Sequence, residues 1–243
     1  MPLLPAFARL SRWGRLVTAS AAVVLGSALI MAVWGLATSE KRVATFEVVG
    51  ALSRISLDVD GADVVIVGGG NRPAVVRRTE QVAFGHTPRV RRDASGGGLE
   101  ITSRCPRTPF GLCSAEFRVT VPTNVPVMVR TGSGSVRLRG FEGSAQVRTG
   151  DGDVDVSGFC GTTLEARADT GDVGAAAVCP PERVVLRSSS GDVRAVAPQA
   201  RYRIEADSDR GSATVRGLQS ADDAPFMLQA LSGSGDVRVE ERR

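Results

Sequence analysis

Acidic residues recur beside glycines in the second half of this sequence, and they raise the first question of chemistry. An aspartate directly follows the last glycine of such a turn four times, at Asp153, Asp172, Asp192 and Asp236. Carboxylates in such turns could bind calcium, and the cluster of Asp151, Asp153 and Asp155 could hydrolyse or cleave a polysaccharide. The equivalent positions Ser135 and Ser212 carry no carboxylate, and Asp and Ser both cap turns by hydrogen bonding to their own backbone. We therefore expect turn capping and predict no metal site.

Other catalytic motifs are missing from the sequence. His86 is the single histidine, and no phosphate-binding loop, dinucleotide fingerprint or HExxH motif occurs. The four cysteines do not have the CxxC spacing typical of zinc sites. We predict no catalytic residue, no cofactor and no enzymatic activity, with a carbohydrate-active enzyme as the weakest of three functional alternatives.

The acidic turns belong to a repeat. We call the second glycine of each turn, or its counterpart, the corner position. Corner positions fall at Gly134, Gly152, Gly171, Gly191, Gly211 and Gly235, with spacings of 18, 19, 20, 20 and 24 residues. The residues seven and five before each corner, and two and four after it, are apolar in all six copies. Such a repeat, with alternating apolar residues on each side of the turn, predicts stacked units of two short strands.

The predicted fold is all-β, a single-chain β-solenoid of about 18–20 residues per coil. Stacked coils bury a continuous column of apolar side chains, and glycine provides the backbone conformation that tight corners need. The same spacing fits earlier segments when Ala62 or Gly97 is taken as the corner, with Arg92 as one misfit. A β-sandwich is the alternative fold, but it does not require the same register in six successive units.

The cysteines provide a test of the predicted stack. Cys160 and Cys179 each follow their corner glycine by eight residues, so adjacent coils should place them one above the other. A strand spacing of about 5 Å would put their Cα atoms within disulfide range. We predict this disulfide, and a second between Cys105 and Cys113 across the intervening loop.

The N-terminus predicts a membrane anchor. Residues 16–37 contain no charge, and a helix of this length would be about 33 Å long, enough to cross a bilayer. Arginines precede this segment, which favours a cytoplasmic N-terminus and an exported C-terminal part. We expect a tail at 1–15, a transmembrane signal anchor at 16–37, a linker at 38–44 and an extracytoplasmic solenoid at 45–243. A cleaved signal peptide is the alternative, and small residues at Gly14, Thr18, Ala22 and Gly26 could pair two such helices in a homodimer.

Charge and composition exclude one class of partner. Lys41 is the only lysine, and aromatic residues make up only 5% of the chain. Arginines alternate with acidic residues along the repeats, so we expect no nucleic-acid binding. One column of arginines stands four residues before the corner, at Arg130, Arg148, Arg167 and Arg187. We expect this column to pair with the stacked turn aspartates and to offset their repulsion.

The repeated turns resemble those of a bacterial adhesin-like family of unknown function, DUF4097. The resemblance is carried by VMVRTGSGSVRL, VRTGDGDVDV and VLRSSSGDVRA, and it covers roughly Phe46 to Glu240. It implies a β-helical extracytoplasmic domain, often tethered by one membrane helix, with no established activity. The departures from the family pattern are the Cys160 and Cys179 pair and an insert within residues 220–225.

Taken together, the sequence predicts a single-pass cell-membrane protein that presents an adhesion or protein-interaction module outside the cytoplasm. Its ligand would be an unidentified protein or glycan. The alternative function is a cell-envelope sensing or regulatory module, which would need a partner subunit because the short tail carries no signalling domain.

Overall fold

The computed structural model describes residues 25–26, 40–48, 50–70, 72–82, 89–94, 96–105 and 113–242. Most of these residues lie in β-strands, which confirms the all-β prediction for the described part of the chain. Of the predicted anchor, only Leu25 and Gly26 are described, and both are helical. In the described ranges no helix is both long and apolar enough to span a bilayer. The anchor at 16–37 otherwise lies outside the described residues.

The strands succeed one another along the chain as follows: β1 (Glu40–Val48), β2 (Arg54–Val59), β3 (Ala62–Gly68), β4 (Ala74–Val82), β5 (Arg89–Asp93), β6 (Gly98–Arg104), β7 (Cys113–Val121), β8 (Val127–Ser133), β9 (Val136–Arg139), β10 (Ala145–Asp151), β11 (Val154–Phe159), β12 (Thr163–Thr170), β13 (Val173–Ala177), β14 (Arg183–Ser190), β15 (Val193–Ala197), β16 (Tyr202–Ser208), β17 (Ala213–Arg216), β18 (Phe226–Ser232) and β19 (Val237–Glu241). β1 begins inside the segment expected to be a linker, because residues 40–48 pair antiparallel with β4.

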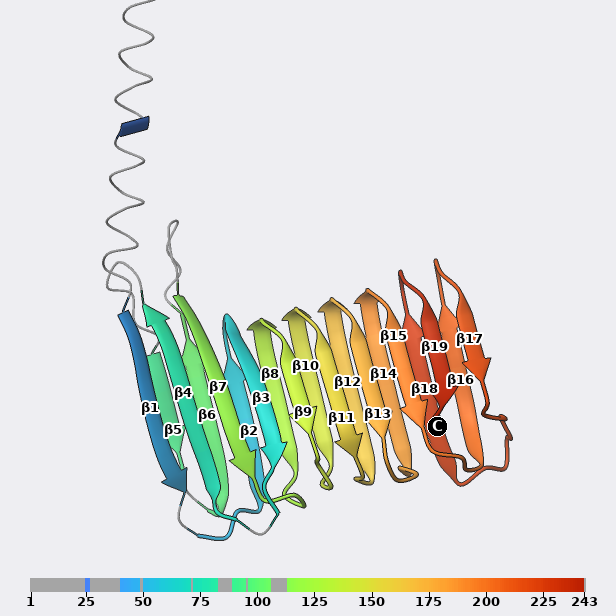
Figure 1. Ribbon diagram of the computed structural model, residues 1–243, viewed down its shortest axis with the longest axis horizontal. Coiled ribbons are helices and arrows are strands. Elements are labelled where there is room, and N and C mark those ends of the chain that lie inside the picture. The colour runs from blue at the N-terminus through green and yellow to red at the C-terminus, as the bar shows by residue number, and fades with distance from the viewer. Residues whose placement is uncertain are drawn as a thin grey trace, which may run out of the picture.

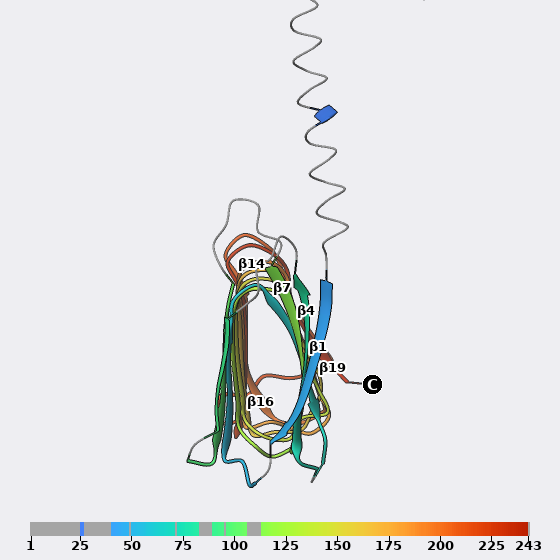
Figure 2. The same ribbon diagram turned by 90° about the vertical axis from the view of Figure 1, so that its left-hand side faces the viewer.

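Two long sheets face each other and form a flattened β-solenoid. One sheet has ten strands in the order β1-β4-β7-β3-β9-β11-β13-β15-β19-β17, and the other has nine in the order β16-β18-β14-β12-β10-β8-β2-β6-β5. Each coil contributes one strand to each sheet, as β8 and β9 do, and neighbouring coils pair in parallel. Figure 1 shows the coils in a row, and Figure 2 shows them superimposed as a narrow loop. The loop has a corner edge, where the corner positions lie, and a return edge, where the chain passes to the next coil.

The coils do not stack in sequence order at the two ends. The last coil, β18 and β19, lies between the coil of β14 and β15 and the coil of β16 and β17. At the other end, the first coil, β2 and β3, lies inside the coil of β6 and β7. The insert predicted within residues 220–225 therefore does more than lengthen a coil. It lets the chain cross back over β16, where the Ala221 N–H donates to the Tyr202 carbonyl.

The assignment of Gly97 as a corner is wrong. β5 and β6, on either side of it, form an antiparallel hairpin within one sheet. Leu99 and Ile101 pair with Ile55 and Leu57 of β2, so they occupy the positions before a corner and not those after it. The strands of this coil in the two sheets are β6, which ends at Arg104, and β7, which begins at Cys113, and residues 106–112 lie outside the described residues. Apolar residues alternate on both sides of a hairpin turn just as they do on both sides of a corner, so periodicity alone did not distinguish a hairpin within one sheet from a corner between two sheets.

The predicted apolar columns form the core. Of the 24 apolar positions around the six corners, 20 are buried. The four that are not buried all belong to the Gly211 coil: Ile204, Ala206, Ala213 and Val215. This coil is at the end of the stack, so no further coil covers its interior side chains. Val215 is 42% exposed.

The opposite end of the stack is closed by polar groups. Arg78 and Glu80 of β4 form an ion pair of 2.9 Å, with the Glu80 side chain only 7% exposed. Arg92 of β5 lies over the ring of Phe46 at 4.3 Å from its centroid. Inward-pointing charges of this kind discourage the addition of further strands at a sheet end.

A row of hydroxyl groups, most of them buried, ties most coils to a neighbouring coil. The residue three positions before a corner donates to the carbonyl of the neighbouring corner, as Thr149 does to Gly134 at 3.1 Å. Ser188 donates to Gly171 at 2.7 Å, Ser232 to Gly191 at 2.8 Å and Ser208 to Gly235 at 2.6 Å. Ala168 holds the equivalent position between Thr149 and Ser188, so one coil lacks this bond.

Replacing Ala168 with serine should restore the missing bond to the carbonyl of Gly152 and stabilise the protein by about 1 kcal/mol. Denaturant unfolding of the full chain would measure the gain. Ala166→Ser is the matched control. Ala166 is fully buried in the apolar column, so a hydroxyl group added there should destabilise the protein. Equal losses of stability in both variants would contradict the proposed bond.

Candidate functional site

The corner edge contains the residues that the sequence singled out. Gly134, Gly152, Gly171, Gly191 and Gly235 have φ between 124° and 150°. Each lies against the corner of the neighbouring coil, and a Cβ placed on any of the five would come within 2.2–2.4 Å of a carbonyl oxygen there. The φ of Gly211 is not positive, but a Cβ placed on Gly211 would also come too close to its neighbour, at 2.1 Å from the carbonyl oxygen of Gly235. The glycines are therefore structural, because they allow the corners of successive coils to stack directly.

The acidic turns form a ladder along the same edge. Oδ1 of Asp153 accepts a hydrogen bond of 2.9 Å from the backbone N–H of Asp172, which lies one coil further along. Asp172 accepts from Asp192 and Asp192 accepts from Asp236, both at 2.8 Å. The prediction of turn capping needs one correction, because each carboxylate caps the backbone of the next coil and not its own. The ladder holds coils together, and Ser212 ends it by donating both its N–H and its hydroxyl to Asp236.

The contacts with Ser212 favour the charged form of Asp236 at the end of the ladder. The backbone N–H and then the hydroxyl of Ser212 hold the pKa of Asp236 below its ordinary value. Among the described residues, no group of three or more His, Cys, Asp or Glu side chains could hold a metal ion. The acidic turns thus have a structural use that explains their spacing.

The arginine column is present, but it does not pair with the turn aspartates as expected. Arg130, Arg148, Arg167 and Arg187 occupy neighbouring positions on the outer face of the nine-stranded sheet. Arg167 forms an ion pair with Glu165, and Arg187 donates to the amide oxygen of Gln229 at 2.8 Å. The strand carries the arginine side chains away from the corner, so they reach neighbours on their own face and not the Asp ladder.

Asp58 extends this row beyond Arg130, and it is bound to another arginine. Arg104 donates to both carboxylate oxygens of Asp58, at 3.0 Å and 2.7 Å. These bonds, opposed by partial burial, hold the pKa of Asp58 below its usual value of 3.8.

Acid should weaken the contribution of Asp58 to stability. Because its pKa is lower in the folded protein, that contribution is complete above 3.8 and is lost as the pH falls through the lowered folded value. Asp58→Asn should therefore cost up to about 1 kcal/mol near neutral pH and much less at a pH below the folded pKa. Urea unfolding at both pH values would measure this difference. Asp151→Asn is the control, since among the described residues Asp151 forms no ion pair, and a cost for Asp58→Asn that did not shrink in acid would contradict the assignment.

Comparisons with known proteins agree with this repeat. Residues 123–224 match the model of the Toastrack DUF4097 family. The chain is therefore similar to this family over a segment that makes up less than half of its length. A crystal structure of a "putative cell adhesion protein" from Clostridium sporogenes matches with a TM-score of 0.52 at 12% identity, covering 84% of this chain and all of that one. A "putative adhesin" from Bacteroides fragilis matches with a TM-score of 0.44 at 12% identity, covering 84% of this chain and 97% of that one. No curated protein matches the sequence.

The DUF4097 resemblance inferred from the sequence is thus confirmed, and the match with the first crystal structure shows a shared fold. At 12% identity it shows no shared ligand or activity. Residues 123–224 contain five of the six corners, from Gly134 to Gly211, so the family model covers most of the regular repeat.

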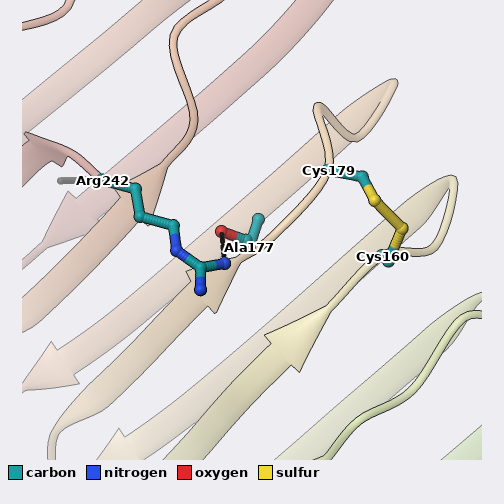
Figure 3. Close-up of a disulfide and its surroundings, with 4 residues drawn as sticks. All are labelled: Cys160, Ala177, Cys179 and Arg242. Atoms are coloured by element: carbon teal, nitrogen blue, oxygen red, sulfur yellow. Dashed lines mark hydrogen bonds between the residues drawn. A yellow bond between two sulfur atoms is a disulfide. The ribbon is translucent and has the colours of Figure 1, made fainter.

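The predicted disulfide between Cys160 and Cys179 is present at the return edge (Figure 3). Their Cα atoms lie 4.8 Å apart, as the stacking of successive coils requires. Nearby, Arg242 donates to the carbonyl of Ala177 at 3.4 Å, which fastens the C-terminal segment to the same edge. Cys105 is also disulfide-bonded, but the side chain of Cys113 lies outside the described residues, so their pairing stays a prediction. His86 lies outside the described residues as well.

A shallow cavity of about 560 Å³ lies on the outer face of the ten-stranded sheet, a feature that sequence reasoning missed. It is lined by Arg194, Val196, Arg216, Gly217, Glu240, Glu241 and Arg242. Arg194 and Glu240 pair across it at 2.7 Å. The cavity depends on the insertion of β19 between β15 and β17, so no periodic signal in the sequence could have revealed it.

Proposed function

We propose that this protein is a membrane-anchored extracytoplasmic solenoid that acts as a surface adhesion or protein-interaction module and has no catalytic activity. The observation that carries this proposal is the pair of broad outer faces, which present side chains in straight rows across strands held in one register. A rigid face of this kind binds through many weak contacts and needs no enclosed pocket. The description of the Clostridium sporogenes structure, which shares this fold, as a "putative cell adhesion protein" is consistent with it.

The register of the first strand suggests how the solenoid would be held at a membrane. Glu40, the first residue of β1, pairs with Val82, which in turn pairs with Cys113. The strand β7 that begins at Cys113 runs beside β3, which begins just after Gly61 at the corner edge. An anchor at 16–37 would therefore connect at the corner edge. Both outer faces would then stand away from the bilayer, and the return edge would point outward.

Localisation can be tested on whole cells. The full chain with Ser189→Cys would carry one added thiol at an exposed position of β14, beyond the native cysteines. A membrane-impermeant maleimide should label it in intact cells if the solenoid is exported. Labelling only after cell lysis would reject the extracytoplasmic location and with it the adhesion function.

Binding experiments separate the alternatives for function. The full chain in detergent micelles would be applied to a glycan array, and the same chain would be purified from membranes with its associated proteins. An adhesion module should bind glycans or external proteins, whereas a sensing module should retain a membrane subunit in fixed proportion. Turnover of a polysaccharide that is lost in Asp151→Asn and Asp153→Asn would support the enzyme alternative and reject the proposal.

A further inference from the structure

Two arginines of the row on the nine-stranded sheet have side-chain partners, Arg167 in Glu165 and Arg187 in Gln229, but these contacts do not account for the alignment of four arginines. Arg130 pairs in register with Arg148, Arg148 with Arg167 and Arg167 with Arg187, each in the next coil of the stack. With neighbouring strands about 4.8 Å apart, the row is roughly 14 Å long. Like charges on directly neighbouring strand positions are destabilising, so the row costs stability in the free protein.

Neighbouring carboxylates compensate little of this charge. Among the described residues, Arg130, Arg148 and Arg187 form no ion pair, and Arg167 pairs with Glu165. Asp58 stands next to Arg130 in register, and the charge of Arg130 acts on its carboxylate, but both carboxylate oxygens accept hydrogen bonds from Arg104. Arg130 and Arg148 are also exposed. The row therefore presents guanidinium groups that can still bind an external anion.

We propose that this row binds an acidic polysaccharide that lies along the solenoid axis, across the strands. Guanidinium groups bind carboxylate, sulfate and phosphate groups through paired hydrogen bonds, and four of them in line match a polymer with a regularly repeated anionic group. A rigid periodic face fits a periodic polymer better than an acidic peptide of irregular sequence. The row lacks the aromatic side chains that would stack on nucleic-acid bases. The proposal rests on the proposed adhesion function and names its ligand class.

The test uses the full chain in detergent micelles, immobilised for interferometry. Three probes of similar length distinguish the anionic groups: polygalacturonate carries carboxylates, dextran sulfate carries sulfates, and dextran is neutral. We expect one or both anionic polymers to bind, with affinity that falls as salt is raised, and dextran not to bind. A galacturonate dimer should bind at least tenfold more weakly than an oligomer long enough to span the row, because it reaches fewer arginines.

A matched pair of variants locates the site. R130Q/R148Q/R187Q removes the three arginines of the row that lack ion pairs and should weaken binding at least tenfold. R77Q/R137Q/R139Q removes the same charge from the outer face of the ten-stranded sheet, where these three residues are exposed and, within the described ranges, form no ion pair. It should change affinity less than about twofold. Unfolding curves would verify that both variants remain folded.

Three results would overturn the inference: no binding to either anionic polymer, equal binding to dextran, or equal losses in the two triple variants. The last would show that net charge and not the row attracts the polymer. If glycan-array or protein binding persists while anionic polysaccharides fail to bind, the inference is wrong but the adhesion function stands. If the row variant alone loses polygalacturonate binding, the inference is supported.

Discussion

Gly171→Ala should destabilise the protein by about 3 kcal/mol or more, which lowers the melting temperature of a domain this size by roughly 6–12 °C. Two costs add at this position. The backbone has φ of 130°, a conformation that residues with a Cβ rarely adopt, and the new methyl group would stand 2.4 Å from the carbonyl oxygen of Gly152. That oxygen belongs to the neighbouring corner, so relief requires the two coils to separate. Thermal and urea unfolding of the full chain would measure the loss.

Two control variants separate the costs. Gly140 also has positive φ, at 60°, but nothing lies within 4 Å of its ideal Cβ, so Gly140→Ala should cost only about 1 kcal/mol. Gly211 has no positive φ but would meet the carbonyl of Gly235 at 2.1 Å, so Gly211→Ala measures the steric cost without the conformational one. If Gly171→Ala were no worse than Gly140→Ala, close stacking of the corners would not be the reason for glycine there.

Stacking of the regular coils could be predicted from the sequence because periodicity fixes it. A strand alternates sides every residue, and parallel neighbours hold the same register, so a constant distance to the corner places Val129, Val147 and Leu186 on one buried column. The same reasoning placed Cys160 above Cys179. In these coils the local pattern and the global fold require the same arrangement.

The order of the end coils could not be predicted in this way. The coil of Gly235 has the same apolar pattern as the coil of Gly211, and either pattern could pack against β14 and β15. Which of the two coils packs there depends on the connection after Arg216, which crosses the end of the stack and forms hydrogen bonds with the edge of β16. There the Ile204 N–H donates to Ser220 Oγ at 3.0 Å. Such a bond between a loop and an edge strand leaves no periodic signal.

The sequence predicted which side chains line up in rows, but not the partners to which they bond. The repeated Asp suggested capping, but its partner could be either its own turn or the next coil, and only the stacked geometry decides for the neighbour. The arginine column was correctly aligned, yet its expected partners were wrong because the corner and the strand face point in different directions. The spacing of residues in the sequence determines which row a residue occupies. Contacts between different rows depend on where the side chains point, which only the three-dimensional structure shows.

Removing the disulfide with Cys160→Ser and Cys179→Ser should cost about 3 kcal/mol. The two cysteines are 19 residues apart, and closing a loop of this length restricts the unfolded chain by roughly that amount. The folded coil should change little, since β11 and β13 remain paired and the Cys160 N–H still donates to the carbonyl of Phe141 at 2.9 Å. Urea unfolding of the full chain would measure the difference.

The origin of this effect can be tested against the corner variants. A disulfide acts through the unfolded chain, whereas the Gly171 corner acts through contacts in the folded stack, so the two losses should add. The triple variant C160S/C179S/G171A should thus lose about 6 kcal/mol or more in total. A total clearly smaller than the sum would show that the two coils already separate when the corner is disturbed. Stability would then be local to each pair of coils, and the disulfide would serve to keep this pair together after its corner opens.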